Sequence, residues 1–251
     1  MTELINKNIE IIFEDENYLI LNKPAGIMVH PDGKSSEYTV CDFLLEKYPG
    51  IENVGEPLKI KKNKESEEFI LISRPGIVHR TDKETSGILL VAKNQKSFEF
   101  YKDKFQNREI EKTYHTFIYG NIKEDSFIIN EPIGRSRKDF RQFKSGKNTR
   151  GEKRSAETHF TVLKRSVQKN LTMLEARPKT GRTHQIRVHL NFIYKPILGD
   201  KLYAPKREVG LGFKRLALHA KSLKFVNQNG EQVSYEVDYP EDFKNALNSF
   251  V

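Results

Sequence analysis

Apolar residues recur along the chain in short runs that predict strands at many places and helices at few. Residues 9–13 and 18–21 are two such runs, and the turn residues Asp15, Glu16 and Asn17 between them are typical of a hairpin. The run at 88–91, Ile-Leu-Leu-Val, indicates a buried strand. Further strands are predicted at residues 113–119, 127–130, 156–163, 171–176, 218–226 and 232–237.

Helical patterns are fewer. One helix is predicted over residues 39–47, where Tyr48-Pro49-Gly50 ends it. A second follows Asn94, which has the side chain of an N-cap, and apolar side chains at three- and four-residue spacing mark one face of it. A last helix is predicted from Glu241 to Asn248. Because strands and helices do not alternate regularly, the pattern predicts an α+β fold with a mostly antiparallel sheet.

The 251 residues are 37% hydrophobic, which is enough to build a core, and we expect one domain over residues 1–251 without a separate N-terminal module. Residues 58–68 alternate Lys and Glu with little apolar content, which predicts a mobile charged insertion. The single cysteine, Cys41, excludes an intramolecular disulfide, and its apolar surroundings predict a buried structural thiol. Neither a membrane-length apolar run nor a signal-peptide core is present, so we expect a cytoplasmic protein.

The net charge of +9 is concentrated in one segment. Residues 135–154 contain nine Lys or Arg against Asp139 and Glu152, which is 9 − 2 = +7 in twenty residues. Phe140 and Phe143 lie between the basic residues. This composition predicts a loop that contacts a polyanion through phosphate groups, with Arg137, Arg141 and Lys144 as candidate RNA contacts. The alternative is a solvated loop with two aromatic anchors in the core.

The segment 76–87, Gly-Ile-Val-His-Arg-Thr-Asp-Lys-Glu-Thr-Ser-Gly, gathers the first candidate chemistry. It leads into the apolar run at 88–91, so we expect a loop held at one edge of a sheet, where functional residues are common. Asp82 follows Arg80 by two residues, and a carboxylate near an arginine in such a loop can act as a nucleophile. The alternative is structural: Asp82 caps a turn and Arg80 pairs with it.

A second unusual run covers 180–189, Thr-Gly-Arg-Thr-His-Gln-Ile-Arg-Val-His. If Thr183 caps a helix here, its polar face presents His184 and Arg187 from a rigid element. The alternative is an amphipathic helix with a solvated polar face. The histidines of the chain lack companions at metal-ligand spacing, and no glycine-rich nucleotide loop is present, so we expect neither a metal nor a cofactor.

These two runs resemble motifs of the RluA family of pseudouridine synthases, namely His-Arg-Leu-Asp-x-x-Thr-Ser-Gly and Thr-Gly-Arg-x-His-Gln-Ile-Arg. Thr81 stands where leucine is usual, which puts the local packing beside Asp82 in question. Three more segments resemble family motifs in the right order: 18–26, Lys112-Thr113-Tyr114 with Gly120, and 215–220. The resemblance covers roughly residues 9 to 240, and it implies a mixed, largely antiparallel central sheet with flanking helices.

The resemblance also implies roles for individual residues. Asp82 is similar to the catalytic aspartate, which acts either as a nucleophile on the sugar or as a base, and Arg187 to its ion-pair partner. Tyr114 is similar to the tyrosine that stacks on the uracil, and Arg80 to the arginine that takes the space of the flipped nucleotide. The remaining candidates contact RNA or order the site: His79, Thr85, Arg182 and His184.

The activity implied is isomerisation of specific uridines in rRNA or tRNA, by a monomer without an obligate protein partner and without the S4-like domain of many ribosomal-RNA members. Two competing functions remain open on the residues alone. A non-catalytic RNA-binding module would explain the basic segment but not the two long motifs. A hydrolase with Asp82 and Glu84 as paired carboxylates would need a fixed separation that two residues on a loop do not define.

Overall fold

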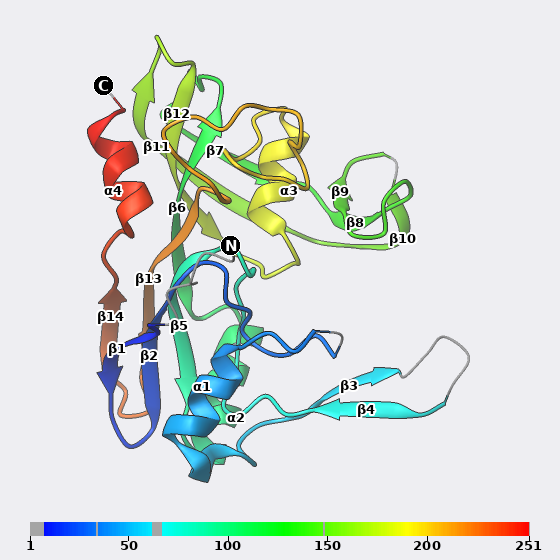
Figure 1. Ribbon diagram of the computed structural model, residues 1–251, viewed down its shortest axis with the longest axis vertical. Coiled ribbons are helices and arrows are strands. Elements are labelled where there is room, and N and C mark those ends of the chain that lie inside the picture. Colours follow the sequence, from blue (N-terminus) through cyan, green and yellow to red (C-terminus); the bar gives the residue numbers. More distant parts are fainter. Residues whose placement is uncertain (1–7, 34, 62–66, 148, 251) are drawn as a thin grey trace. The chain divides into compact units, whose positions relative to one another are not determined.

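The computed structural model describes residues 8–33, 35–61, 67–147 and 149–250, and Figure 1 shows the elements they form. The chain divides into two compact units. Unit 1 contains the residues up to Ile110 together with Lys224–Val237, and unit 2 contains Glu111–Leu223 together with Asp238–Val251. Each unit has its own helices and apolar core, and each is described by itself.

The strands β1 (Glu10–Glu14), β2 (Tyr18–Lys23) and β5 (Ser86–Ala92) of unit 1 pair antiparallel in that order. The turn between β1 and β2 is fixed by the Asp15 carboxylate, which accepts from the backbone N–H groups of Asn17 and Tyr18 at 2.7 Å each. All seven residues of β5 are buried, which confirms the buried strand predicted for this run. β14 (Gln232–Glu236) pairs with β13 (Leu218–Val226), the strand whose residues divide between the two units.

The helices of unit 1 are α1 (Val40–Lys47) and α2 (Gln95–Gln106), and the short 3-10 turn η1 (Pro49–Ile51) follows α1. Thr39 and Asp42 form a reciprocal capping box at the start of α1, and Asn94 caps α2, as its sequence position predicts. Helix α1 carries Cys41 into an apolar cluster, where its thiol donates to the Val29 carbonyl at 3.3 Å. The prediction of a buried structural thiol is therefore confirmed.

A two-stranded ribbon in unit 1 was not predicted. It consists of β3 (Leu58–Lys61) and β4 (Phe69–Ile72), paired antiparallel. The predicted charged insertion at 58–68 overlaps β3, and its residues 62–66 lie outside the described ranges.

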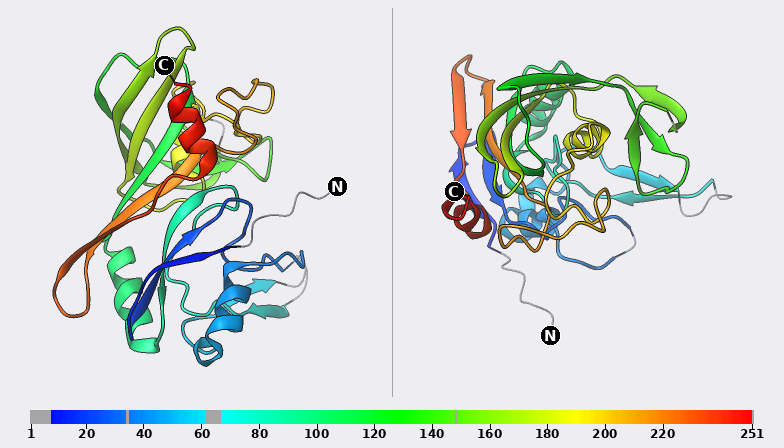
Figure 2. Two further views of the ribbon diagram at one scale, coloured as in Figure 1. Left: turned by 60° about the vertical axis from the view of Figure 1, so that its left-hand side comes forward. Right: turned by 90° about the horizontal axis from the view of Figure 1, so that it is seen from above.

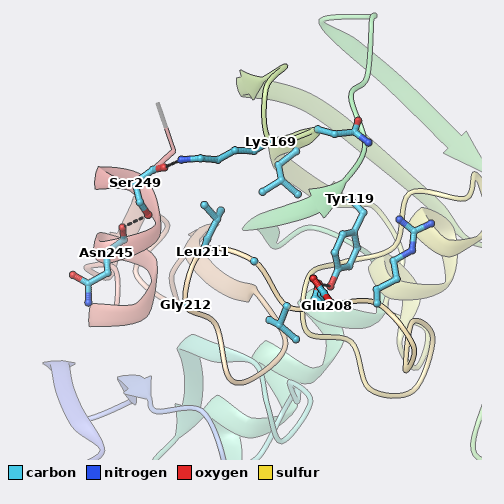
Figure 3. Close-up of a pocket in the computed structure, with 12 residues that line it drawn as sticks. Tyr119, Lys169, Glu208, Leu211, Gly212, Asn245 and Ser249 are labelled. Carbon is cyan, nitrogen blue, oxygen red and sulfur yellow. Dashed lines mark hydrogen bonds between the residues drawn. The ribbon is translucent and has the colours of Figure 1, made fainter.

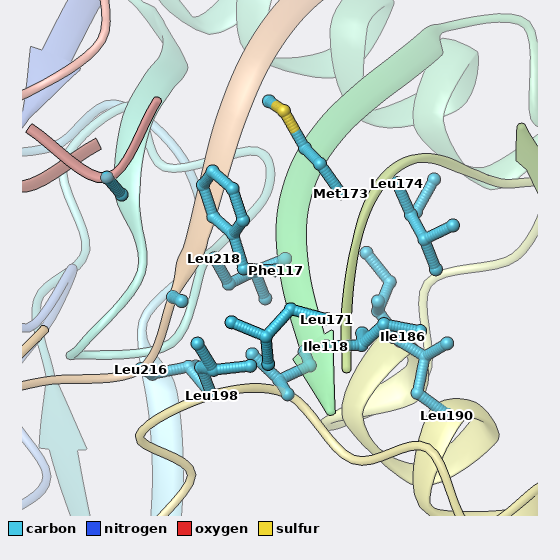
Figure 4. Close-up of a cluster of buried hydrophobic side chains, with 14 of the residues drawn as sticks. Phe117, Ile118, Leu171, Met173, Leu174, Ile186, Leu190, Leu198, Leu216 and Leu218 are labelled. Carbon is cyan, nitrogen blue, oxygen red and sulfur yellow. The ribbon is translucent and has the colours of Figure 1, made fainter. Parts of the chain in front are cut away.

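The strands β6 (Glu111–Tyr119), β12 (Leu171–Pro178), β11 (Glu157–Ser166) and β7 (Ser126–Asn130) of unit 2 pair antiparallel in that spatial order. These curved strands wrap around helix α3 (Gln185–Phe192), as the right-hand view of Figure 2 shows. Ile186 and Leu190 of α3 belong to the same core cluster as Phe117, Leu174 and Leu198 (Figure 4). A second helix, α4 (Glu241–Asn248), adds Phe243 to this core.

The described residues of the basic segment 135–154 form strands and not an open loop. It contains most of a small antiparallel sheet of β8 (Ile133–Ser136), β9 (Phe143–Ser145) and β10 (Thr149–Arg154), in the order β10-β8-β9. These strands were not predicted, because glycine and charged residues interrupt their apolar pattern. We refer to residues 133–154 as the basic hairpin. The α+β class and the largely antiparallel sheets are as predicted.

Candidate functional site

The Asp82 loop of unit 1 follows a sharp backbone turn at Gly76. Gly76 has φ +65°, and a Cβ there would lie 2.1 Å from the Ala92 carbonyl oxygen, so only glycine fits. The loop is then held along β5: Ile77 bridges Val91, and the His79 ring accepts from the Leu90 backbone N–H at 2.8 Å through Nε2. The loop before the apolar run is therefore fixed to strand β5.

His79 has an ordering role in this geometry. Because Nε2 accepts a backbone hydrogen bond, that nitrogen is unprotonated and occupied. The ring also stacks on Phe105 of α2, with centroids 4.3 Å apart and planes at 22°. Both contacts link the Asp82 loop to two elements of unit 1.

We predict that His79→Phe destabilises unit 1 by about 2 kcal/mol, because it leaves the Leu90 N–H without its acceptor. His79→Gln retains an acceptor and should cost less than half of that. Urea unfolding of the two variants measures the difference. Equal stability of both would show that the bond to Leu90 contributes nothing to holding the loop.

Lys23, at the end of β2, holds the Asp82 loop through hydrogen bonds. Its side chain is fully buried, and its ammonium donates to the carbonyls of Pro24 at 3.0 Å, Ile27 at 2.9 Å and Lys83 at 3.4 Å. Gly26 adds a backbone bond to the same Lys83 carbonyl at 2.8 Å. The residue after Asp82 is thus held by a buried cation, which keeps positive charge close to the loop.

Asp82 itself is half-buried, between two buried threonines. The Thr85 N–H donates to the Asp82 carbonyl at 3.1 Å, which closes the turn. The hydroxyls of Thr81 and Thr85 have no hydrogen-bond partner within the described residues. Thr81, the departure from the family motif, therefore places a buried polar atom beside Asp82 where the usual leucine would place none. Arg80 is exposed, and its guanidinium lies 3.1 Å from Nε2 of His30, whose pKa is lowered by burial and by the Arg80 charge.

In unit 2, Tyr114 lies on β6 opposite Ala176 of β12. It is partly buried and packs against the main core of the unit. Its strand position matches the expected alternation, and its ring is held by packing.

Helix α3 places Arg187 in a buried ion pair with a residue that the sequence analysis missed. Arg187 Nε donates to Oδ2 of Asp200 and Nη2 to Oδ1, each at 2.8 Å, and both side chains are at most 9% exposed. Asp200 Oδ1 also accepts from the backbone N–H groups of Leu202 and Tyr203 at 3.0 Å each. A fork of two parallel bonds to a fixed carboxylate gives the guanidinium one orientation. The available signal for Asp200 was the Gly199-Asp200 pair directly after the apolar residues Ile197 and Leu198.

The start of α3 differs from the prediction. Its N-cap is His184, in a left-handed conformation with φ 56°, and not Thr183. The His184 side chain makes no capping bond. The Gln185 side chain holds this end of the helix, since it accepts from the Arg182 N–H and donates to the Glu157 carbonyl. Arg187 is buried, so the alternative of a wholly solvated polar face is wrong for this residue.

The basic hairpin separates its two phenylalanines. Phe143 is partly buried and lies under the Arg135 guanidinium, 5.1 Å from Cζ, whereas Phe140 is 70% exposed at the turn. Arg137 Nε donates to the Thr149 carbonyl at 2.8 Å. Arg141 makes an exposed pair with Asp139, and these bonds lower the pKa of the Asp139 carboxyl. Arg182 donates to the carbonyl of Ser155, the residue directly after the hairpin, at 3.0 Å.

The predicted residues thus form two groups. His79, Arg80, Asp82 and Thr85 share one loop of unit 1, and Tyr114, Arg137, Arg141, Lys144, Arg182, His184 and Arg187 belong to unit 2. Unit 2 also contains a pocket of about 780 Å³ beside Tyr119, Arg207 and Leu211 (Figure 3), and none of the predicted residues lines it. Among the described residues, no cluster of three His, Cys, Asp or Glu side chains could hold a metal ion. None of the helices there has the length and apolar character to cross a membrane.

Comparison with known proteins gives one consistent result. The family model described as RNA pseudouridylate synthase matches residues 17–192. An uncharacterized RNA pseudouridine synthase, YlyB of Bacillus subtilis, is 35% identical over 246 residues, which cover 96% of this chain and 73% of the relative. Ribosomal large subunit pseudouridine synthase D of Zymomonas mobilis is 33% identical, covering 94% and 71%. The solved structure of human RNA pseudouridylate synthase domain containing 1 has the same fold, with a TM-score of 0.71 at 24% identity over 93% of this chain and 84% of that one.

Proposed function

We propose specific catalytic roles from the premise that the chain belongs to the RNA pseudouridylate synthase family. The chain is accordingly an isomerase that converts uridine in RNA to pseudouridine. This reaction breaks the bond between the sugar and nitrogen 1 of uracil and rejoins the base through carbon 5. It needs a base taken out of its stack, a carboxylate, and groups that hold the detached uracil.

The carboxylate that we propose is Asp82. It is half-buried on a loop that the bond from Leu90 of β5 to His79 and the ammonium of Lys23 of β2 hold in place, so it has a set position. It acts either by attacking the sugar or by removing a sugar proton. Fixed placement of a single carboxylate is the observation that supports the proposal most directly.

Arg187 is the proposed ion-pair partner of Asp82. The Asp200 carboxylate accepts from Nε and Nη2 of Arg187, and this fork of two bonds holds the guanidinium in one orientation. A bidentate guanidinium can serve two carboxylates at once because it has five donors in a rigid plane. Tyr114 is the proposed ring that stacks on the uracil, with its hydroxyl available for the proton transfer at carbon 5. Exposed Arg80 is the proposed side chain that fills the place of the flipped base.

Tritium release from RNA labelled at carbon 5 of uridine tests the function. Isomerisation replaces the hydrogen at carbon 5, so the protein should release tritium and leave the RNA chain intact. A binding module would release none, and a hydrolase would release free base or cut the strand. Absence of release from both ribosomal and transfer RNA substrates would reject the proposal.

The substrate that we propose is structured RNA, ribosomal or transfer, modified by a cytoplasmic monomer without an obligate protein partner. Relatives named ribosomal large subunit pseudouridine synthase D support the ribosomal alternative. Mapping of pseudouridines in RNA from cells with and without the gene identifies the target. Sedimentation of the purified protein measures whether it is a monomer.

The basic hairpin is proposed to contact RNA phosphates. Changing Arg137, Arg141 and Lys144 together to Ser should weaken RNA binding, and each lost contact should reduce the slope of log affinity against log salt by about 0.7 to 0.9. Turnover at saturating RNA should change less than about twofold, because no proposed catalytic group lies on the hairpin. Titration of labelled RNA at several salt concentrations measures the slope.

A matched control removes the same charge elsewhere. Lys96, Lys164 and Lys224 are exposed and lie outside the hairpin, and their combined change to Ser lowers the net charge equally. If the control reduces the salt slope as much as the hairpin variant, the effect is one of total charge, and the hairpin is not the RNA contact.

A further inference from the structure

Tyr203 connects the Arg187 ion pair to the basic hairpin through one side chain. It lies in the segment after α3, three residues beyond Asp200, and its backbone N–H donates to Asp200 Oδ1 at 3.0 Å. Nothing in the sequence motifs assigns it a role. Its two ends contact different parts of unit 2, and these contacts are described in turn.

The hydroxyl of Tyr203 contacts the hairpin and the start of α3. It accepts from the Phe143 backbone N–H of β9 at 3.0 Å, and it lies 3.0 Å from Nδ1 of His184. Because the amide supplies one proton, the single hydroxyl proton is available to Nδ1 of His184. Gln142 adds a parallel tie, from its Nε2 to the Leu202 carbonyl at 2.7 Å. The hairpin is therefore attached to the segment 202–203 by two hydrogen bonds.

The ring of Tyr203 contacts the ion pair. Cζ of Arg187 lies 5.1 Å from the ring centroid, within the range of an attractive cation–π contact. Asp200 restrains the guanidinium in its own plane, through the fork of two bonds, and the ring restrains it from one face. The two bonds to Asp200 and the contact with the Tyr203 ring together restrain the Arg187 guanidinium.

We propose that Tyr203 is a positioning residue with two separable functions: its ring sets the Arg187 guanidinium for the reaction, and its hydroxyl sets the basic hairpin for RNA. The proposal rests on the proposed function, because Arg187 and the hairpin take their roles from it. It predicts that the hydroxyl governs KM for RNA and the ring governs kcat.

The test compares Tyr203→Phe with Tyr203→Leu. The phenylalanine variant loses the hydroxyl and retains the ring, so KM for RNA should rise about fivefold, the order of one hydrogen bond, with kcat within twofold. The leucine variant loses both, so KM should rise equally and kcat should also fall about tenfold. Tyr203→Met is the replacement if the leucine variant does not fold. Wild-type kcat in the aliphatic variants, or an equal loss of kcat in the phenylalanine variant, would overturn the proposal.

Tyr119 offers a matched control in the same unit. Its hydroxyl donates to the Glu208 carbonyl at 2.7 Å, and Cζ of Arg207 lies 4.9 Å from its ring centroid, in the pocket of Figure 3. Tyr119→Phe and Tyr119→Leu thus remove the same kinds of contact away from Arg187. Both should leave KM and kcat within twofold of wild type. A Tyr119→Leu variant that reproduces the kinetic losses would show that Tyr203 acts only through general stability.

One readout is independent of activity. Loss of the Tyr203 hydroxyl should accelerate hydrogen exchange of the Phe143 amide about tenfold, whether or not the protein modifies RNA. Unchanged exchange in Tyr203→Phe would reject the tie to the hairpin. Faster exchange with no tritium release by the wild-type protein would reject the proposed function and leave the tie in place.

Discussion

Asp82→Asn should abolish tritium release and pseudouridine formation, with RNA affinity within about twofold of wild type. The amide has nearly the shape of the carboxylate and keeps the half-buried loop packed, but it is neither a base nor a nucleophile. A rate above about a tenth of wild type corresponds to less than about 1.4 kcal/mol of barrier, which would exclude Asp82 as the catalytic group. Tritium release at saturating RNA gives the rate, and filter binding gives the affinity.

Glu84→Gln is the matched control, since it makes the same chemical change two residues away on the same loop. Its rate should stay within about threefold of wild type. A loss comparable to that of Asp82→Asn would support the paired-carboxylate arrangement that a hydrolase needs, and the products would then decide between the two reactions.

Arg187→Ala should lower kcat by at least about a hundredfold and destabilise unit 2 by about 3 to 5 kcal/mol. The first effect follows if Arg187 is the cation of Asp82, as proposed, and the second from Asp200, which is 1% exposed and would be left as an uncompensated buried charge. Arg187→Lys should also have low activity, because one ammonium cannot reproduce the two parallel bonds that the guanidinium donates to Asp200. Single-turnover kinetics and urea unfolding measure the two effects separately.

The Arg215–Asp242 pair separates loss of catalysis from loss of stability. It has the same bidentate geometry, at 2.6 and 2.9 Å, and its arginine also lies over an aromatic ring, that of Phe243. Arg215→Lys should therefore lower stability while the folded protein keeps its kcat. Full activity of Arg187→Lys would show that the reaction needs only the positive charge of Arg187 and not its planar shape.

Local sequence patterns predicted the strands and helices that are determined by residues close together in the chain. The run at 88–91 became β5 because its residues are apolar without interruption, and Asn94 caps α2 because its side chain reaches the Ser97 N–H three residues on. The strands of the basic hairpin were missed, since their pairing depends on tertiary contacts such as Phe143 with Tyr203. The N-cap of α3 was placed one residue early because the left-handed backbone of His184 has no signal in its side chain.

The functional residues could likewise be predicted only where the signal is local in the sequence. Asp82 and Arg187 lie within long, distinctive motifs, so the sequence alone singled them out. Asp200 and Tyr203 do not, because the functions we assign to them exist only through partners thirteen or more residues away. A residue that orients another is visible when the distances are known, whereas a reactive side chain can be suspected from its type and its neighbours.

The burial of Cys41 has a practical consequence for experiments on this chain. It is the single cysteine, 2% exposed, and burial raises its pKa to about 12, so its thiol stays protonated and shielded at neutral pH. The native sequence is therefore a background in which an introduced surface cysteine would be the reactive one. Cysteines placed at Lys138 on the basic hairpin and at Lys96 on α2 could carry a pair of fluorophores, one on each unit. Their energy transfer would test whether adding RNA changes the distance between the two labelled residues.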